Sequence, residues 1–139
     1  MIQLIYVSSA NVTFSNQELK ELLIESRSNN LVNDITGMLL YKDGNFMQVL
    51  EGEERVINST LLKISGDRRH KDMITLLREP VSERSFPDWS MGFGNLNDAG
   101  LENLPGYNDF LNSSMLSAEF TNDPDSCRKL LLSFKQHMH

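Results

Sequence analysis

The sequence predicts an α+β fold in which a five-stranded mixed sheet carries two helices on one face and a C-terminal helical extension on the other. Short apolar runs with a two-residue alternation, which is typical of strands, are interleaved with two longer stretches of helical spacing. An Asp-Gly pair between two strand-like runs indicates a hairpin. The expected order is β-α-β-β-α-β-β, and its first six elements form the split β-α-β arrangement of ferredoxin-like folds.

The first predicted strand spans residues 2–8, and apolar residues on both of its faces favour a central position in the sheet. Tyr6 shares one face with Ile2 and Leu4, because side chains alternate along a strand. A phenol in such an apolar row usually has a hydrogen-bond partner. We therefore expect Tyr6 to be buried and hydrogen-bonded.

A helix is predicted from Ser15 to about Asn29, since Ser15 and Glu18 fit the capping box that begins many helices. Its inward stripe is apolar at the start and polar at the end, where Ser26 and Asn30 follow three leucines. These two residues either close the helix, an ordinary role for Asn, or face a ligand with amide-like or carbonyl groups. The helix pattern leaves both alternatives open.

Two strands, 35–41 and 45–52, are predicted on either side of the turn 42–45. Gly37 indicates a bulge or a close approach by backbone or ligand. Gln48 lies in a row of large apolar residues, where its amide needs partners for one carbonyl and two N–H groups. It is either a satisfied core glutamine or part of a ligand site.

A second helix is predicted from about residue 52 to Gly66, followed by strands at 73–77 and 89–93. The charged segment 67–71 lies between the helix and the first of these strands. It is either a solvated turn or a segment that binds a phosphate or a ribose hydroxyl at the mouth of a pocket.

The pattern changes after Asn95, where short helical turns are predicted around Pro105 and Gly106. A final helix is predicted to begin at Pro124. We expect this tail to cover the second face of the sheet, with partner binding as the alternative. The predicted units are residues 1–96 and the C-terminal extension 97–139.

Composition limits the classes of function. The net charge of −6, without a dense Lys/Arg run, argues against nucleic-acid binding. No apolar stretch approaches the roughly 20 residues that a membrane span needs, and the N-terminus lacks a signal-peptide pattern, so a cytoplasmic protein is expected. Cys127 is the single cysteine, and the three histidines show no ligand spacing, so no metal site is expected.

The predicted topology brings Tyr6 and Gln48 onto neighbouring central strands, which we expect to run parallel to each other. Both should point toward the helices, where Ser26 and Asn30 face them. A phenol, two amides and a hydroxyl around one apolar pocket favour a flat, hydrogen-bonding ligand. These residues alone do not name the ligand.

Six motifs occur in order over residues 1 to about 95, and they read Tyr6-x-Ser8, Ser26-Arg27-Ser28-Asn29-Asn30, Ile35-Thr36-Gly37, Phe46-x-Gln48-x-Leu50-Glu51-Gly52, Asp67-x-Arg69-His70 and Phe86-x-x-Trp89-x-Met91. Together they resemble the BLUF family, the sensors of blue light using flavin. The short tail is similar to that of stand-alone members. By this resemblance, residues 1–96 are the flavin-binding domain.

The resemblance implies a blue-light photoreceptor, not an enzyme, that holds FAD non-covalently with its ring between the two helices. Tyr6 would give an electron and a proton after excitation. Gln48 would then rearrange, by rotation or by tautomerisation, and change the hydrogen bonds to the flavin. The signal would pass through the fifth strand, by way of Trp89 or Met91, and through the C-terminal helices. Both pairs of alternatives stay open.

The resemblance also implies a set of FAD-binding residues, in which Asn30 would bind the polar edge of the ring and Phe46 and Ile64 would form apolar walls. The full set is Ser26, Arg27, Asn29, Asn30, Phe46, Gln48, Lys63, Ile64, Asp67, Arg69 and His70. We expect a homo-oligomer and a downstream protein partner that the sequence does not identify, without nucleic acid or membrane. The alternative is a small ferredoxin-like enzyme, flavin-dependent or acylphosphatase-like.

Overall fold

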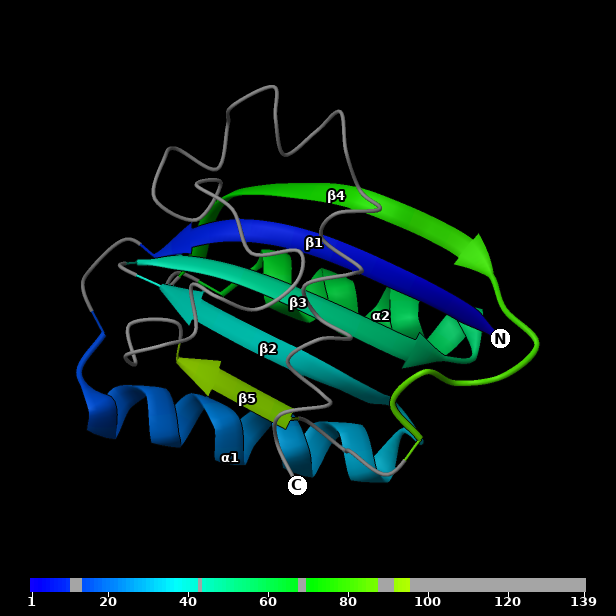
Figure 1. Ribbon diagram of the computed structural model, residues 1–139, viewed down its shortest axis with the longest axis horizontal. Coiled ribbons are helices and arrows are strands. Elements are labelled where there is room, and N and C mark those ends of the chain that lie inside the picture. Colours follow the sequence, from blue (N-terminus) through cyan, green and yellow to red (C-terminus); the bar gives the residue numbers. More distant parts are fainter. Residues whose placement is uncertain (11–13, 43, 68–69, 88–91, 96–139) are drawn as a thin grey trace, which may run out of the picture.

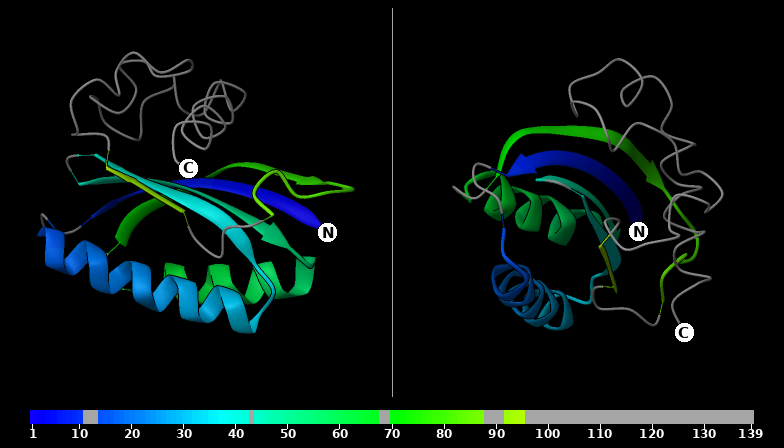
Figure 2. Two further views of the ribbon diagram at one scale, coloured as in Figure 1. Left: turned by 60° about the horizontal axis from the view of Figure 1, so that its bottom comes forward. Right: turned by 60° about the vertical axis from the view of Figure 1, so that its left-hand side comes forward.

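The computed structural model describes residues 1–10, 14–42, 44–67, 70–87 and 92–95. The strands in these residues form one sheet in the order β4-β1-β3-β2-β5, with β1 and β3 near its centre (Figure 1). Figure 2 shows α1 and α2 side by side on one face of this sheet. The elements are β1 (Ile2–Ala10), α1 (Asn16–Val32), β2 (Thr36–Lys42), β3 (Asn45–Gly52), α2 (Glu54–Ser65), β4 (His70–Pro80) and β5 (Gly92–Asn95).

The α+β class and the two helices on one face agree with the prediction, but the direction of one central pair was wrong. β1 and β3 are antiparallel, with Tyr6 opposite Gln48, whereas we expected parallel strands. The helical crossover makes β1 and β2 parallel, and the hairpin then reverses the chain, so β3 must run against β1. The reversal leaves both side chains on one face, since alternation does not depend on strand direction.

The far edge of the sheet is formed by β5, which pairs with β2 in parallel from Met38 opposite Gly92 to Tyr41 opposite Asn95. The start of the predicted strand at 89–93 falls on residues 88–91, which lie outside the described part of the chain. The predicted C-terminal extension, with the boundary at residue 96, also lies outside it.

The first helix begins with the predicted capping box, in which Glu18 N donates to Ser15 Oγ at 3.1 Å and Ser15 N donates to Glu18 Oε1 at 3.2 Å. It continues to Val32, three residues beyond the predicted end. Asn33 closes it by donating its backbone N–H to Asn29 O at 3.1 Å. No described helix has the length and apolar character needed to cross a membrane.

The core on the helix side of the sheet joins the inward stripe of α1 to the pocket-side row of each central strand. Phe14, Tyr41 and Phe46 form an aromatic cluster at one end, with centroid distances of 4.9–6.3 Å. The buried members are Ile2, Leu4, Tyr6, Phe14, Leu19, Leu22, Leu23, Ile35, Leu39, Tyr41, Phe46, Leu50 and Ile57.

Candidate functional site

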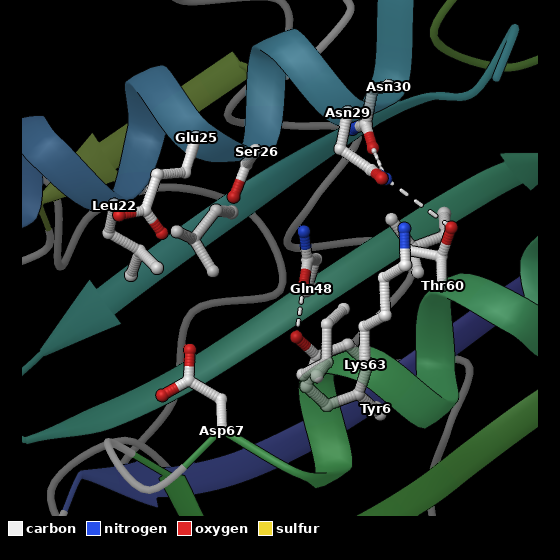
Figure 3. A pocket seen from close by; sticks show the side chains of 13 residues that line it. Tyr6, Leu22, Glu25, Ser26, Asn29, Asn30, Gln48, Thr60, Lys63 and Asp67 are labelled. Atoms are coloured by element: carbon white, nitrogen blue, oxygen red, sulfur yellow. Dashed lines mark hydrogen bonds between the residues drawn. The ribbon is translucent and has the colours of Figure 1, made fainter. Parts of the chain in front are cut away.

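A pocket of about 180 Å³ lies between α1 and α2, and the central strands form its floor (Figure 3). Each wall combines apolar and polar side chains. The strands contribute Tyr6, Leu39, Gln48 and Leu50; α1 contributes Leu22, Glu25, Ser26, Asn29 and Asn30; α2 and the residues after it contribute Thr60, Lys63, Ile64 and Asp67.

Tyr6 and Gln48 meet in the floor of this pocket. They are direct partners across β1 and β3, and the Tyr6 hydroxyl donates a hydrogen bond to Gln48 Oε1. Their exposed fractions are 1% and 4%. The structure therefore brings together the phenol and the amide that strand alternation placed on the same face, and it shields their hydrogen bond from water.

Burial raises the pKa of the Tyr6 phenol well above its ordinary value, and the nearby negative charge of Asp67 raises this pKa further. Both effects disfavour the phenolate. Tyr6 thus keeps its proton at neutral and moderately alkaline pH, and it remains a hydrogen-bond donor to Gln48.

The polar end of α1 connects the two helices. Asn29 Nδ2 donates to Thr60 Oγ1 on α2 and to Asn30 Oδ1, each at 3.4 Å, while Asn33 Nδ2 donates to Asn29 Oδ1 at 3.1 Å. Asn30 and Thr60 are buried. The helix closes at Asn33, so Asn30 belongs to the pocket wall as well as to the last turns of α1.

Charged groups stand at the edge of the pocket. Figure 3 shows Glu25 and Asp67 at one end and Asn29 and Thr60 at the other, and the long side chain of Lys63 extends from α2 toward Thr60. The pocket thus has carboxylate acceptors at one end and amide and hydroxyl groups at the other. In the described ranges, no group of three or more His, Cys, Asp or Glu side chains is arranged to hold a metal ion.

Some of the predicted site residues are not among those that line the pocket. Arg27 lies on the exposed face of α1. Phe46 is buried, and its ring packs edge-on against Phe14 and at a tilt against Tyr41. Arg69, Trp89 and Met91, and the side chain of His70, lie outside the described part of the structure.

Five lining residues were not predicted as site residues. The spacing of Ser26 and Gln48 points to two of them, because Leu22 is one turn before Ser26 on α1 and Leu50 shares a strand face with Gln48. Glu25 and Leu39 carry no such local signal. The five are Leu22, Glu25, Leu39, Leu50 and Thr60.

Comparison with known protein families shows the family to which this chain belongs. The family model for BLUF, described as sensors of blue-light using FAD, matches residues 1–92. The chain belongs to the BLUF family. The resemblance carried by the six motifs is therefore confirmed, and the family is one of flavin-binding blue-light sensors.

The curated BLUF relatives are much longer proteins. The photoactivated adenylate cyclase subunit beta of Euglena longa is 34% identical over 85% of this chain, a match that covers 13% of that subunit. The alpha subunit of Euglena gracilis is 37% identical over 62% of this chain and 8% of its own length. The present chain thus spans a small part of either relative.

Solved structures of BLUF proteins share the fold. The dark-state structure of BlrB has a TM-score of 0.80 and 26% identity, covering 99% of this chain and 96% of BlrB. The photo-activated state of BlsA has a TM-score of 0.74 and 31% identity, covering 94% and 91% of the two chains. Klebsiella pneumoniae BlrP1 with FMN and cyclic diGMP has a TM-score of 0.64 and 34% identity, covering 69% and 26%.

The residues of the pocket suit a flavin ring. Leu22, Leu39, Leu50 and Ile64 supply apolar surface for the faces of a flat ring, and the amide and hydroxyl groups supply donors and acceptors for an edge that alternates carbonyl and N–H groups. The chemistry of the lining residues therefore fits the cofactor that the family uses.

Proposed function

We propose that this chain is a blue-light photoreceptor that binds FAD non-covalently between α1 and α2 and switches hydrogen bonds through Tyr6 and Gln48. The observation that carries the proposal is the buried hydrogen bond from the Tyr6 hydroxyl to Gln48 Oε1 in the pocket floor. A core glutamine needs no pocket beside it, whereas this one lies in a cavity with apolar walls and several amide groups.

The ring is held by the residues that line the pocket. Asn30 and Gln48 present amides to its polar edge, and Ile64 forms part of an apolar wall. The other lining residues from the predicted set are Ser26, Asn29, Lys63 and Asp67. Lys63, Arg69 and His70 are proposed for the phosphate end of FAD.

When bound, an oxidised flavin supplies a ring that absorbs blue light and then acts as a strong one-electron oxidant. Tyr6 is the nearby phenol in the pocket floor that can give an electron. Its proton has an acceptor in contact, because the hydroxyl already points at Gln48 Oε1. The Gln48 amide carries donor and acceptor on one group, so its rotation or tautomerisation changes what it presents to the pocket.

The proposed signal leaves the pocket through the sheet. β3, which carries Gln48, pairs with β2, and β2 pairs with β5. Trp89 or Met91 and the C-terminal extension 97–139 continue this route to a protein partner, in a homo-oligomer of the chain. The cyclase activity named for the Euglena relatives belongs to those longer proteins, and we propose a sensor without enzymatic activity of its own.

Absorption spectroscopy of the purified protein with FAD tests the proposal. The wild type should be yellow, should shift its absorption slightly to the red under blue light, and should recover in darkness. Tyr6→Phe should keep the flavin and lose the shift, because the phenolic proton is gone.

Tyr41→Phe is the matched control, since Tyr41 is also buried on the sheet but does not line the pocket. It should keep the photocycle. A colourless wild type, or bound flavin that turns over a substrate without a red shift, would favour the enzyme alternative. A normal photocycle in Tyr6→Phe would remove Tyr6 from the mechanism.

A further inference from the structure

Glu51 is a buried carboxylate with a role that the pocket does not explain. It follows Gln48 by three positions on β3 and therefore points to the opposite face of the sheet. Its exposed fraction is 0%. Its oxygens accept hydrogen bonds from Gln3 Nε2 at 2.9 Å, from the Ser85 backbone N–H at 2.8 Å and from the Phe86 backbone N–H at 2.7 Å.

Arg84 adds a second attachment at the same place. Its guanidinium donates to Glu51 O at 3.1 Å, to Thr36 Oγ1 at 2.9 Å and to Asp34 O at 2.7 Å, and it forms an ion pair with the Asp34 carboxylate at 3.3 Å. Residues 84–86 are thus fastened to the end of β3 and the start of β2. Figure 1 shows the connection from β4 passing this corner on its way to β5.

We propose that Glu51 is a positioning residue that couples the Gln48 site to residues 84–86, the segment that leads to β5. This inference rests on the proposed function and adds a route on the sheet face opposite the pocket. We call residues 84–86 together with Glu51 the Glu51 latch.

The register of β1 and β3 explains how a change at Gln48 can reach the Glu51 latch. Tyr6 opposes Gln48, and Gln3 opposes Glu51, so β1 and β3 share two side-chain hydrogen bonds on opposite faces. The pairs are three residues apart, which is about 10 Å along a strand. A shift of β3 against β1 at Gln48 therefore also moves Glu51 relative to Gln3 and to residues 84–86.

The latch depends on a carboxylate in particular. Ser85 N–H and Phe86 N–H donate to different oxygens of Glu51, so both oxygens must act as acceptors. An amide has one acceptor and one donor group. Glu51→Gln keeps the size of the side chain but turns an N–H group toward one of the two backbone donors, and this breaks one attachment.

Amide hydrogen exchange at Ser85 and Phe86, followed by NMR in darkness and under blue light, tests the proposal. In the wild type with FAD, the exchange rates should differ between light and dark by about fivefold or more, the lower end of typical coupling between sites. In Glu51→Gln the red shift should persist, because the pocket is unchanged. Dark exchange should become about tenfold faster, and the light–dark ratio should fall to about one.

Glu53→Gln is the matched control, because Glu53 is exposed and two residues away. It should keep the wild-type ratio. A merely structural Glu51 would speed exchange equally in light and dark and leave the ratio intact, and that result overturns the proposal. If Glu51→Gln does not fold, Arg84→Gln removes the second attachment and should also bring the light–dark ratio of exchange rates toward one. An unchanged ratio in Arg84→Gln would then overturn the proposal.

The wild-type spectrum distinguishes a failure of the proposed function from a failure of the Glu51 latch. Without flavin binding or a red shift, the proposed function fails whatever the latch does. With a normal red shift but identical exchange at Ser85 and Phe86 in light and dark, the proposed function stands and the Glu51 latch fails.

Discussion

At the scale of single residues, the proposed function depends on one pair of side chains. Tyr6 and Gln48 are the phenol and the amide of a hydrogen bond at the base of a cavity. The hydrogen bond gives two buried polar groups a partner, and both side chains also line the cavity. The pair is therefore a structural contact that the proposed function also makes a reactive one.

Gln48→Ala should keep the flavin and abolish the red shift, because the rearranging amide is gone. It also leaves the Tyr6 hydroxyl without the acceptor that the structure shows, which should lower the free energy of unfolding by roughly 1–3 kcal/mol. The light-minus-dark spectrum and urea unfolding measure the two effects. If the variant instead loses FAD, Gln48 is first of all a binding residue.

The raised pKa of Tyr6 predicts a dependence of stability on alkaline pH. Above about pH 10 the unfolded chain releases the phenolic proton while the folded protein keeps it, so stability falls by up to about 1.4 kcal/mol per pH unit from this group. Below that pH both states hold the proton and the effect vanishes. Urea unfolding from pH 9 to 11 should give a shallower decline for Tyr6→Phe; equal slopes would contradict the assignment.

At the scale of elements, the approach of β2 to β3 is limited by a single glycine. A Cβ added to Gly37 would lie 2.0 Å from Val49 O, a backbone atom of β3. Of the two alternatives that the sequence left open, a close backbone approach is the one observed. Any side chain at Gly37 must therefore push the two strands apart.

Gly37→Ala should lower the free energy of unfolding by about 2–4 kcal/mol, because the clash is with backbone that is itself hydrogen-bonded. Gly66→Ala is the control, since its nearest neighbour would be 3.5 Å away and its backbone is right-handed. It should change the stability by less than about 1 kcal/mol. Equal losses in the two variants would show that space at Gly37 is not limiting.

The two helices are held at one end of the pocket by the hydrogen bond from Asn29 to Thr60. Thr60→Val keeps the shape and removes the acceptor, so FAD should dissociate about two- to tenfold faster, corresponding to roughly 0.5–1.5 kcal/mol. Stopped-flow fluorescence of released flavin measures the rate. Ser59→Ala changes an exposed position on the same helix and should leave the dissociation rate of FAD unchanged. If Thr60→Val and the wild type release FAD at the same rate, the hydrogen bond from Asn29 to Thr60 does not help to retain FAD.

At the scale of the whole molecule, the sequence predicted what local patterns determine. The capping box at Ser15 and the turn after β2 set the element order, and strand alternation placed Tyr6 and Gln48 on one face. The direction of β3 was wrong, because it follows from counting reversals of the chain and not from any residue. Glu25 and Leu39 were missed as pocket residues, since their place depends on how α1 and β2 are rotated in the fold.

The contacts of Glu51 were also beyond sequence reasoning. Its acceptors serve Ser85 and Phe86, which lie 34 and 35 positions away along the chain. Such pairing follows from tertiary packing, which no local pattern encodes. For the same reason, the motif that contains Gln48 and Glu51 indicated a single flavin site. In the structure Gln48 lines the pocket, whereas Glu51 contacts residues 84–86 on the other face of the sheet.

Alternation along β3 has a practical consequence for anyone who wishes to redesign this sensor. In the proposed function, the even-numbered residues Gln48 and Leu50 line the flavin pocket, so substitutions there should change the colour and the recovery time. Glu51 faces the other way, and in the proposed latch its substitution should change the strength of the output. Because the proposed Glu51 latch couples the two faces through β3, substitutions on one face should be tested in combination with substitutions on the other.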